Sequence, residues 1–416
     1  MRSPPTPRTV SGLGTAIGLV AAGVVAAGVA AAATVGPAAD AGTTGAVERI
    51  GGVPLPPDEQ IPEPDLTRHD VDLDDILLIT GAVDAEGTVG ALPLSETRPD
   101  QLARHRDSIP PIERPRYVTV ADADPPGGDD GLVLGFVADD GKAYAYPIAI
   151  LNRHEIVNER LAGTPVVITY CPLCRSGVVY DRRVGDHELT FGNTNALYDN
   201  DLVLYDHQTN SFWWQLAGRA IVGELTGARL EAVPSSMMRY ADWVDQHPGT
   251  LVLSTDTGFD RHYGGGSLDG YQQAVNAGSL PFDPTGPGID DDRLRPGDEV
   301  VGVAVGDEAR AYPLEEGPAV VNDEVGGRPL VVLTTATGTG ARVFDRAVDG
   351  RTLAFEESDD GDLVDRETGS TWSASGEALS GPLVGAQLTS VPSRTAFWFA
   401  FASAFPHADV AGIDAS

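Results

Sequence analysis

The chain has very little cysteine and almost no lysine. Its 416 residues include two cysteines, Cys171 and Cys174, and one lysine, Lys142. Two cysteines exclude a scaffold stapled by several disulfides and a four-cysteine zinc ribbon built from one chain. With 28 basic and 61 acidic residues the net charge is −33. Such a surface repels polyanions, so nucleic acid is not an expected partner.

Acidic residues, in contrast, are abundant and come in runs such as Asp290, Asp291 and Asp292. Dense carboxylates stay hydrated in concentrated salt, where a Debye length of about 3 Å or less weakens their mutual repulsion. This pattern predicts a halophilic protein, and an ordinary acidic protein from a GC-rich genome is the alternative. Apolar residues make up 42% of the chain, which is enough to form a core.

The N-terminal region carries a long uncharged stretch. Arg2 and Arg8 precede residues 11–39, which are rich in alanine, valine and glycine. This order predicts a signal peptide or a transmembrane anchor over residues 1–40, with the rest of the chain secreted or anchored outside the cytoplasm. Contact with a membrane is expected only through this segment. Residues 41–116 are acidic and rich in proline, so we expect a spacer and lead-in in which residues 76–80 pack on the body.

From residue 117 onward, short runs of β-branched and aromatic residues alternate with turn signals about every ten residues. This spacing predicts a mainly β protein with antiparallel strands, and helices only near residues 148–161 and 237–246. The expected strands of the first half are residues 166–170, 178–180, 188–191, 202–205, 212–216 and 220–222.

The chain also repeats itself. Residues 165–191 align without a gap on residues 329–355, and Asn158, Asp206 and Trp214 correspond to Asn322, Asp365 and Trp372. We therefore predict two tandem related antiparallel β modules, a first copy (residues 117–256) and a second copy (residues 299–410), joined by a connection over residues 257–298. Residues shared by the copies indicate architecture: Asp206 and Asp365 are expected in hairpin turns, and Trp214 and Trp372 in the core.

A set of reactive side chains is present in the first copy only. In the second copy His154 becomes Pro318, Glu155 becomes Ala319, Cys171 becomes Thr335, Cys174 becomes Gly338 and Gln215 becomes Ser373. Their joint loss suggests that they serve one purpose.

The first hypothesis for that purpose is a metal site made by Cys171, Cys174 and His154, completed by an unidentified fourth donor. A Cys-x-x-Cys pair lets two thiolates converge on one ion, and thiolate-rich sites favour copper(I) or zinc. The expected supporting residues are Glu155, Asn158, Tyr170, Arg175 and Gln215.

Two other functions stay open. The cysteines could perform thiol-disulfide chemistry outside the cytoplasm, although they follow a strand and do not begin a helix. Alternatively, they could form a small disulfide in a structural surface module without catalytic activity. The sequence shows no catalytic triad, phosphate-binding loop or paired-carboxylate motif, so it does not indicate an enzyme class, and it identifies no protein partner.

Asn193, Asn195, Asp199 and Asp201 could together hold a cation such as calcium. Their spacing does not match an EF-hand, and the run from Gly192 to Ala196 is more typical of a loop.

Several short motifs of the sequence resemble those of the DUF3179 family of bacteria and archaea. They include His-Glu-Ile-Val-Asn at residues 154–158, Tyr-Cys-Pro-Leu-Cys at 170–174, and Asp-Thr-Gly-Phe at 256–259. The resemblance covers about residues 109–410 and implies no settled activity or ligand. Arg153 and Arg175 stand where the family often has tryptophan and glycine, next to the expected site.

Overall fold

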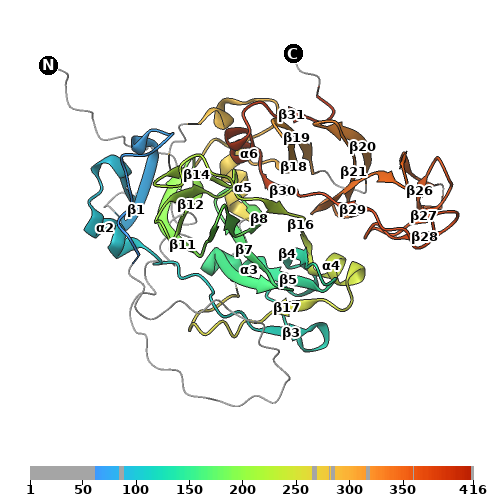
Figure 1. Ribbon diagram of the computed structural model, residues 1–416, viewed down its shortest axis with the longest axis horizontal. Coiled ribbons are helices and arrows are strands. Elements are labelled where there is room, and N and C mark those ends of the chain that lie inside the picture. The colour runs from blue at the N-terminus through green and yellow to red at the C-terminus, as the bar shows by residue number, and fades with distance from the viewer. Residues whose placement is uncertain are drawn as a thin grey trace.

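The fold is taken from a computed structural model, which describes residues 61–83, 89–264, 269–280, 282, 286–314, 319–358 and 360–413. The stretch expected to be a signal peptide or anchor lies outside these residues. Among the described residues, no helix is both long and apolar enough to span a membrane. The protein is mainly β, as the sequence predicts, and its strands form several antiparallel sheets linked by short helices (Figure 1).

The first copy begins with a five-stranded sheet in the order β16-β4-β5-β17-β3. All neighbours are antiparallel except β17 and β5. The strands are β3 (Tyr117–Thr119), β4 (Leu132–Val137), β5 (Ala143–Pro147), β16 (Ser235–Arg239) and β17 (Leu251–Leu253).

An eight-stranded sheet joins the two copies in the order β31-β19-β18-β30-β8-β7-β6, with β15 also paired to β8. The junction is the pair of β30 and β8, where Thr395 lies opposite Gly177. The first copy supplies β6 (Ile156–Leu161), β7 (Thr164–Cys171), β8 (Ser176–Asp181) and β15 (Ala232–Val233). The second copy supplies β18 (Glu299–Val305), β19 (Glu308–Pro313), β30 (Arg394–Phe397) and β31 (Asp409–Val410).

The lead-in is part of the first copy's third sheet, in the order β14-β13-β12-β11-β1-β2. Residues 76–80 pack on the body as predicted, because they lie in β1, which pairs with β11. The strands are β1 (Ile76–Val83), β2 (Val89–Pro93), β11 (Phe191–Tyr198), β12 (Asp201–Asp206), β13 (Phe212–Trp214) and β14 (Arg219–Val222). Short helices flank β1 and β2: η1 (Leu73–Asp75), η2 (Leu94–Glu96) and α2 (Pro99–His105).

The second copy repeats this order of strands. One sheet runs β20-β21-β22-β29 and another runs β25-β26-β27-β28, matching β6-β7-β8-β15 and β11-β12-β13-β14. The strands are β20 (Val320–Val325), β21 (Arg328–Thr334), β22 (Ala341–Asp345), β25 (Phe355–Glu357), β26 (Leu363–Asp365), β27 (Thr371–Trp372), β28 (Ala378–Ser380) and β29 (Thr389–Ser390). The small hairpins also correspond: β9 (Arg183–Val184) with β10 (His187–Glu188), and β23 (Ala347–Val348) with β24 (Arg351–Thr352).

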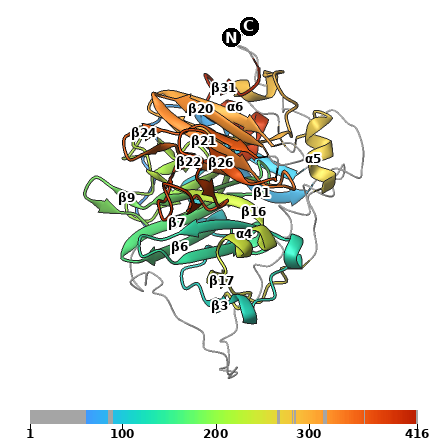
Figure 2. The same cartoon turned by 90° about the vertical axis from the view of Figure 1, so that its right-hand side faces the viewer.

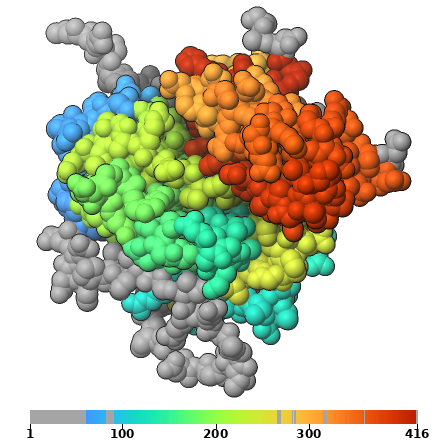
Figure 3. All heavy atoms as spheres, turned by 45° about the vertical axis from the view of Figure 1, so that its right-hand side comes forward, coloured from blue at the N-terminus to red at the C-terminus, as the bar shows by residue number. Residues whose placement is uncertain are grey.

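Each copy places a strand beside the other copy. β30 of the second copy pairs with β8, and β16 of the first copy lies against β22 (Figure 2). The two copies thus pack through β30 and β16, and the second copy covers one side of the first (Figure 3). One continuous core contains residues of both copies, since Cys171 and Val178 lie in one cluster with Phe399 and Phe401.

Two expected helices are shorter than predicted. The segment 148–161 divides into α3 (Ile148–His154) and strand β6, because Glu155 takes a left-handed backbone conformation (φ 58°) that ends the helix. The segment 237–246 divides into the end of β16 and α4 (Tyr240–Gln246). Helices also form outside these two regions, so the expectation of helices only there is wrong: the remaining ones are α5 (Asp269–Asn276), α6 (Trp398–Ala404), η3 (Val120–Asp122), η4 (Gly128–Asp130) and η5 (Pro287–Asp290).

The expected strands are confirmed with two changes of bounds: residues 188–191 fall partly on β10 and partly on β11, and the strand expected over residues 212–216 ends at Trp214. The hairpin turns at Asp206 and Asp365 are also confirmed, since each carboxylate accepts a backbone hydrogen bond of 2.6 Å from the threonine three residues later. The pairing of Trp214 with Trp372 is wrong by one residue. The indole of Trp213, like that of Trp372, donates a 2.9 Å hydrogen bond to the aspartate of its turn.

Candidate metal centre

The two cysteines lie on one tight hairpin. Cys171 ends β7 and faces Ser176 at the start of β8, so Cys174 lies in the loop between the paired strands. Arg175 completes the turn in a left-handed conformation (φ 49°). Both thiols are free and buried, with exposed fractions of 1% for Cys171 and 0% for Cys174.

A second hairpin brings a carboxylate to the thiols. Asp199 and Asn200 form the two-residue turn between β11 and β12, and both have positive φ, as the tight turns of β-hairpins require. The turn places Asp201 beside the cysteines, with 2.9 Å between its Oδ1 and the Sγ of Cys174. The backbone oxygen of Asn200 lies 3.8 Å from each sulfur.

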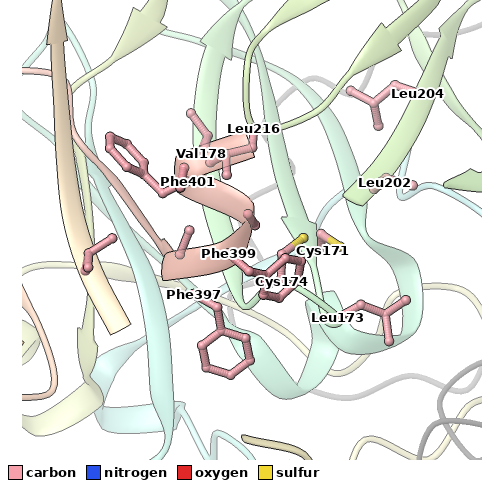
Figure 4. Close-up of a cluster of buried hydrophobic side chains, with 14 of the residues drawn as sticks. Cys171, Leu173, Cys174, Val178, Leu202, Leu204, Leu216, Phe397, Phe399 and Phe401 are labelled. Carbon is pink, nitrogen blue, oxygen red and sulfur yellow. The ribbon is translucent and has the colours of Figure 1, made fainter. Parts of the chain in front are cut away.

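Cys171, Cys174 and Asp201 therefore form a compact group. One ligand atom from each residue lies within 4.8 Å of the other two, and all three side chains are buried. Backbone amides of Leu202 and Leu216 orient the carboxylate, donating at 2.9 and 2.8 Å. Figure 4 shows the two sulfurs side by side within the apolar cluster, with Leu173 and Leu202 close to them.

The second copy closes the site. The backbone amide of Phe397 donates a 2.8 Å hydrogen bond to the carbonyl of Cys174, and Phe399 contributes to the surrounding core. Arg175 reaches across to form a 3.0 Å ion pair with Glu299. The loop with the cysteines is thus held from both sides, which limits its freedom to move.

Burial determines the electrostatics of the site. Loss of solvation raises the pKa of Cys171, and it raises the pKa of Cys174 well above the usual value. The same cause raises the pKa of Asp201 to about 6. At neutral pH the thiols are protonated, and ionising the group would bury uncompensated negative charge. A bound cation would remove this penalty.

His154 does not join this group. Its ring is fully buried, and both nitrogens have other partners: Nδ1 lies 2.8 Å from the carbonyl oxygen of Pro110, and Nε2 lies 2.7 Å from the hydroxyl of Tyr263. Burial lowers its pKa to about 4, so the imidazole is neutral at physiological pH. The structure therefore assembles a Cys/Cys/Asp set in place of the predicted Cys/Cys/His set.

Glu155, the neighbour of His154, is the residue of that motif that approaches the thiols. Its carboxylate is buried and accepts a 2.6 Å hydrogen bond from the side-chain amide of Asn193. Burial raises its pKa to about 8, and the charge of Asp201 adds to the effect. The charge of Glu155 in turn raises the pKa of Cys171, which indicates that these groups lie within electrostatic reach of one another.

Gln215 supports the cysteine loop. Its Oε1 accepts a 2.7 Å hydrogen bond from Ser176, and its Nε2 donates a 2.8 Å bond to Thr169. The hydroxyl of Ser176 also lies 3.6 Å from the sulfur of Cys174. Tyr170 points to the opposite face of β7 and packs in a different apolar cluster from Cys171.

Asn158 serves the scaffold. It bonds the backbone of Phe191 in both directions, at 2.7 and 2.9 Å, and Asn322 makes the same pair with Phe355. The interaction is present in both copies, so it belongs to the architecture that they share.

The connection between the copies also reaches the site. Tyr271 on α5 packs in the apolar cluster that contains both cysteines, and the charges of Cys174 and Cys171 contribute to raising its pKa. Its hydroxyl is buried without a hydrogen-bond partner among the described residues. An unpaired buried hydroxyl costs about 1–3 kcal/mol, so a further polar partner is expected at this position.

Comparison with known proteins agrees with the sequence resemblance. The family described as "Protein of unknown function (DUF3179)" matches residues 106–408, more than half of the chain. Searches of curated proteins and of solved structures found no match.

Proposed function

Because the chain belongs to the DUF3179 family, whose description assigns no function, we propose a function from the site itself: Cys171, Cys174 and Asp201 bind one zinc ion. The observation that carries this proposal is the convergence of two thiols and a carboxylate within 4.8 Å in a buried position. Zinc accepts sulfur and carboxylate oxygen ligands together. Copper(I) prefers softer donors, so the carboxylate favours zinc over copper.

The donor set leaves a fourth position for a zinc ion. Sites with three protein ligands commonly keep this position for water or a small molecule. The unpaired hydroxyl of Tyr271 is in the same cluster and is available to a ligand at that position. This arrangement supports an ion with one exchangeable position.

Burial argues against thiol-disulfide exchange as the main function. Attack on a partner's disulfide needs an accessible thiolate, whereas both sulfurs are enclosed and their pKa values are raised. The closeness of the two free thiols still permits them to be oxidised to a disulfide, and this would compete with ion binding.

Elemental analysis tests the proposal directly. Full-length protein, reduced and supplied with zinc, is expected to hold about one ion per chain after gel filtration. Cys171→Ser and Asp201→Asn should each hold less than a tenth of that amount. His154→Gln is the matched control, because it changes a buried residue of the same region that lies outside the group. Absence of zinc, copper and iron from the unmutated protein would contradict the proposal. Finding copper and no zinc would identify the ion as copper and contradict the choice of zinc.

We also propose that the protein works outside the cytoplasm. The support is the uncharged stretch at residues 11–39 after Arg2 and Arg8, and the acidic composition of the rest. Protease treatment of intact cells should degrade the protein or release it, while a cytoplasmic control protein stays intact. Protection of the whole chain would contradict export.

A further inference from the structure

A small crevice leads toward the cysteine and aspartate group. Its volume is about 40 Å³, and two of its lining residues are chain neighbours of the proposed ligands: Leu173 lies between the cysteines, and Leu202 follows Asp201. The other lining residues are Ile79, Ile109, Glu155, Asn193, Asn195, Ala196 and Leu197. The crevice therefore lies beside the chain segments that carry the buried site.

Among the described residues that line this crevice, Glu155 is the only ionisable one. It is 7% exposed and is held by the amide of Asn193 at 2.6 Å. A carboxylate in a mainly apolar crevice offers an oxygen ligand to a cation that must shed its water before it reaches the thiols.

The backbone at Glu155 indicates that its position matters. The residue adopts a left-handed conformation (φ 58°), which costs about 1–2 kcal/mol for a residue with a side chain. Its counterpart in the second copy is Ala319, and that copy also lacks the cysteines. The strained residue therefore occurs in the copy that carries the thiols.

We propose that Glu155 is the access residue for the ion: a divalent cation enters the crevice, binds the Glu155 carboxylate for a short time, and then passes to Cys171, Cys174 and Asp201. This inference rests on the proposed function. It assigns a kinetic role to a residue outside the set of three ligands. Glu155 contacts the ion only during entry and exit, so it affects the rates of binding and release more than the binding constant.

Rapid-mixing measurements test this role. Reduced, metal-free protein is mixed with zinc held by a coloured chelator, and the transfer rate and the equilibrium constant are both recorded. For Glu155→Gln we expect uptake and release each to slow at least tenfold, while the affinity changes less than threefold. Glu155→Asp keeps a carboxyl group and should recover part of the rate, which separates access from a general loss of structure.

Glu113→Gln is the matched control. Glu113 is also a shielded carboxylate that accepts from an asparagine amide, at 3.1 Å from Asn158, but it does not line the crevice. Its variant should keep the rates of the unmutated protein. Equal rates in Glu155→Gln and the unmutated protein would overturn the access role while zinc binding stands. A loss of affinity as large as that of Asp201→Asn would make Glu155 a ligand, and this would also overturn the inference.

Discussion

The cysteine loop of the first copy and its counterpart in the second copy connect corresponding strands but are used in different ways. Residues 171–176 include the two cysteines, whereas residues 335–340 consist of threonine, alanine and glycine. A Cβ atom on Gly340 would lie 2.1 Å from the carbonyl oxygen of Met237, so this end of the loop must stay small to pack on the first copy. The first loop carries two of the proposed ligands, whereas the second packs against the first copy without them.

This difference shows what a duplicated fold can separate. The residues that both copies share build the fold of each copy. The second copy lacks the cysteines, and its Phe397 and Glu299 contact the cysteine loop of the first copy. The site therefore depends on the second copy although all three proposed ligands come from the first.

The largest expected effect concerns a pair of aspartates. Asp201 has a counterpart, Asp360, at the offset that aligns Asp206 with Asp365, but Asp360 is exposed. Asp201→Asn should weaken zinc binding more than a hundredfold, because it removes a charged ligand from a buried site. Asp360→Asn should leave the affinity unchanged. Competition with a chelator measures both values, and similar losses would mean that Asp201 acts only through its charge at a distance.

A second comparison uses the residues that the copies share. Asp206 and Asp365 each accept hydrogen bonds from a threonine amide and a tryptophan indole. Replacing either by asparagine should lower the free energy of unfolding by about 1–3 kcal/mol, because a buried donor loses its partner. Urea unfolding checks this, and zinc content should not change. A variant that lost zinc but kept its stability would show that the turn belongs to the site.

A smaller effect is expected on the stability of the metal-free protein as a function of pH. It depends on Glu155, which the second copy replaces by Ala319. Glu155 is protonated in the folded state up to about pH 8, but it ionises near its usual pKa of 4.5 when unfolded. The unfolded chain thus binds fewer protons at neutral pH, and stability falls as pH rises toward 8. Burial lowers the pKa of His154, His207 and His247 to about 4, so the unfolded chain takes up their protons first as the pH falls. These histidines therefore lower the stability of the fold only below about pH 6.5.

Between pH 7 and 8 the loss due to Glu155 should be about 1 kcal/mol. Glu155→Gln should reduce this slope, and a saturating zinc concentration should reverse it, because binding favours the deprotonated thiols. Thermal melting at several pH values in the presence of chelator measures the slope. The same slope in the variant and the unmutated protein would show that Glu155 is ionised in the fold at neutral pH.

Much of the fold could be predicted from the sequence because it follows from local patterns. Alternating apolar residues and turn signals gave the strands, and the repeated Asp-x-x-Thr-x-Ser turns gave the second copy. Helix bounds were less accurate, because the end of α3 depends on one left-handed residue, Glu155. The pairing of Trp214 was wrong by one position, because the offset that aligns Asp206 with Asp365 places Trp213 on Trp372, and the hydrogen bond from Trp213 to Asp206 confirms this.

The cysteines could be predicted as a candidate site, but their third partner was not, because the sequence pattern placed Asp201 only in a calcium set with Asn193, Asn195 and Asp199. The comparison of copies selected residues that the second copy lacks, and Asp201 does not pass this test because Asp360 is also aspartate. His154 passes it, yet its ring is used to hold Pro110 and Tyr263. The signal that could have identified Asp201 is the Asp199–Asn200 turn, which predicts a tight hairpin, although nothing local shows that this hairpin meets the cysteine loop.

The smallest effect is expected from transferring the thiols to the second copy. Thr335→Cys with Gly338→Cys restores the spacing of the motif, but both positions are only half-buried, and residue 338 has a left-handed backbone (φ 66°) that disfavours a side chain. Asp360 is exposed, so no enclosed carboxylate completes the set. Zinc content should therefore stay at one ion per chain, while the two new thiols react with a thiol reagent in the folded protein. A second bound ion would show that the loop alone is sufficient, and the aspartate hairpin would then lose its place in the site.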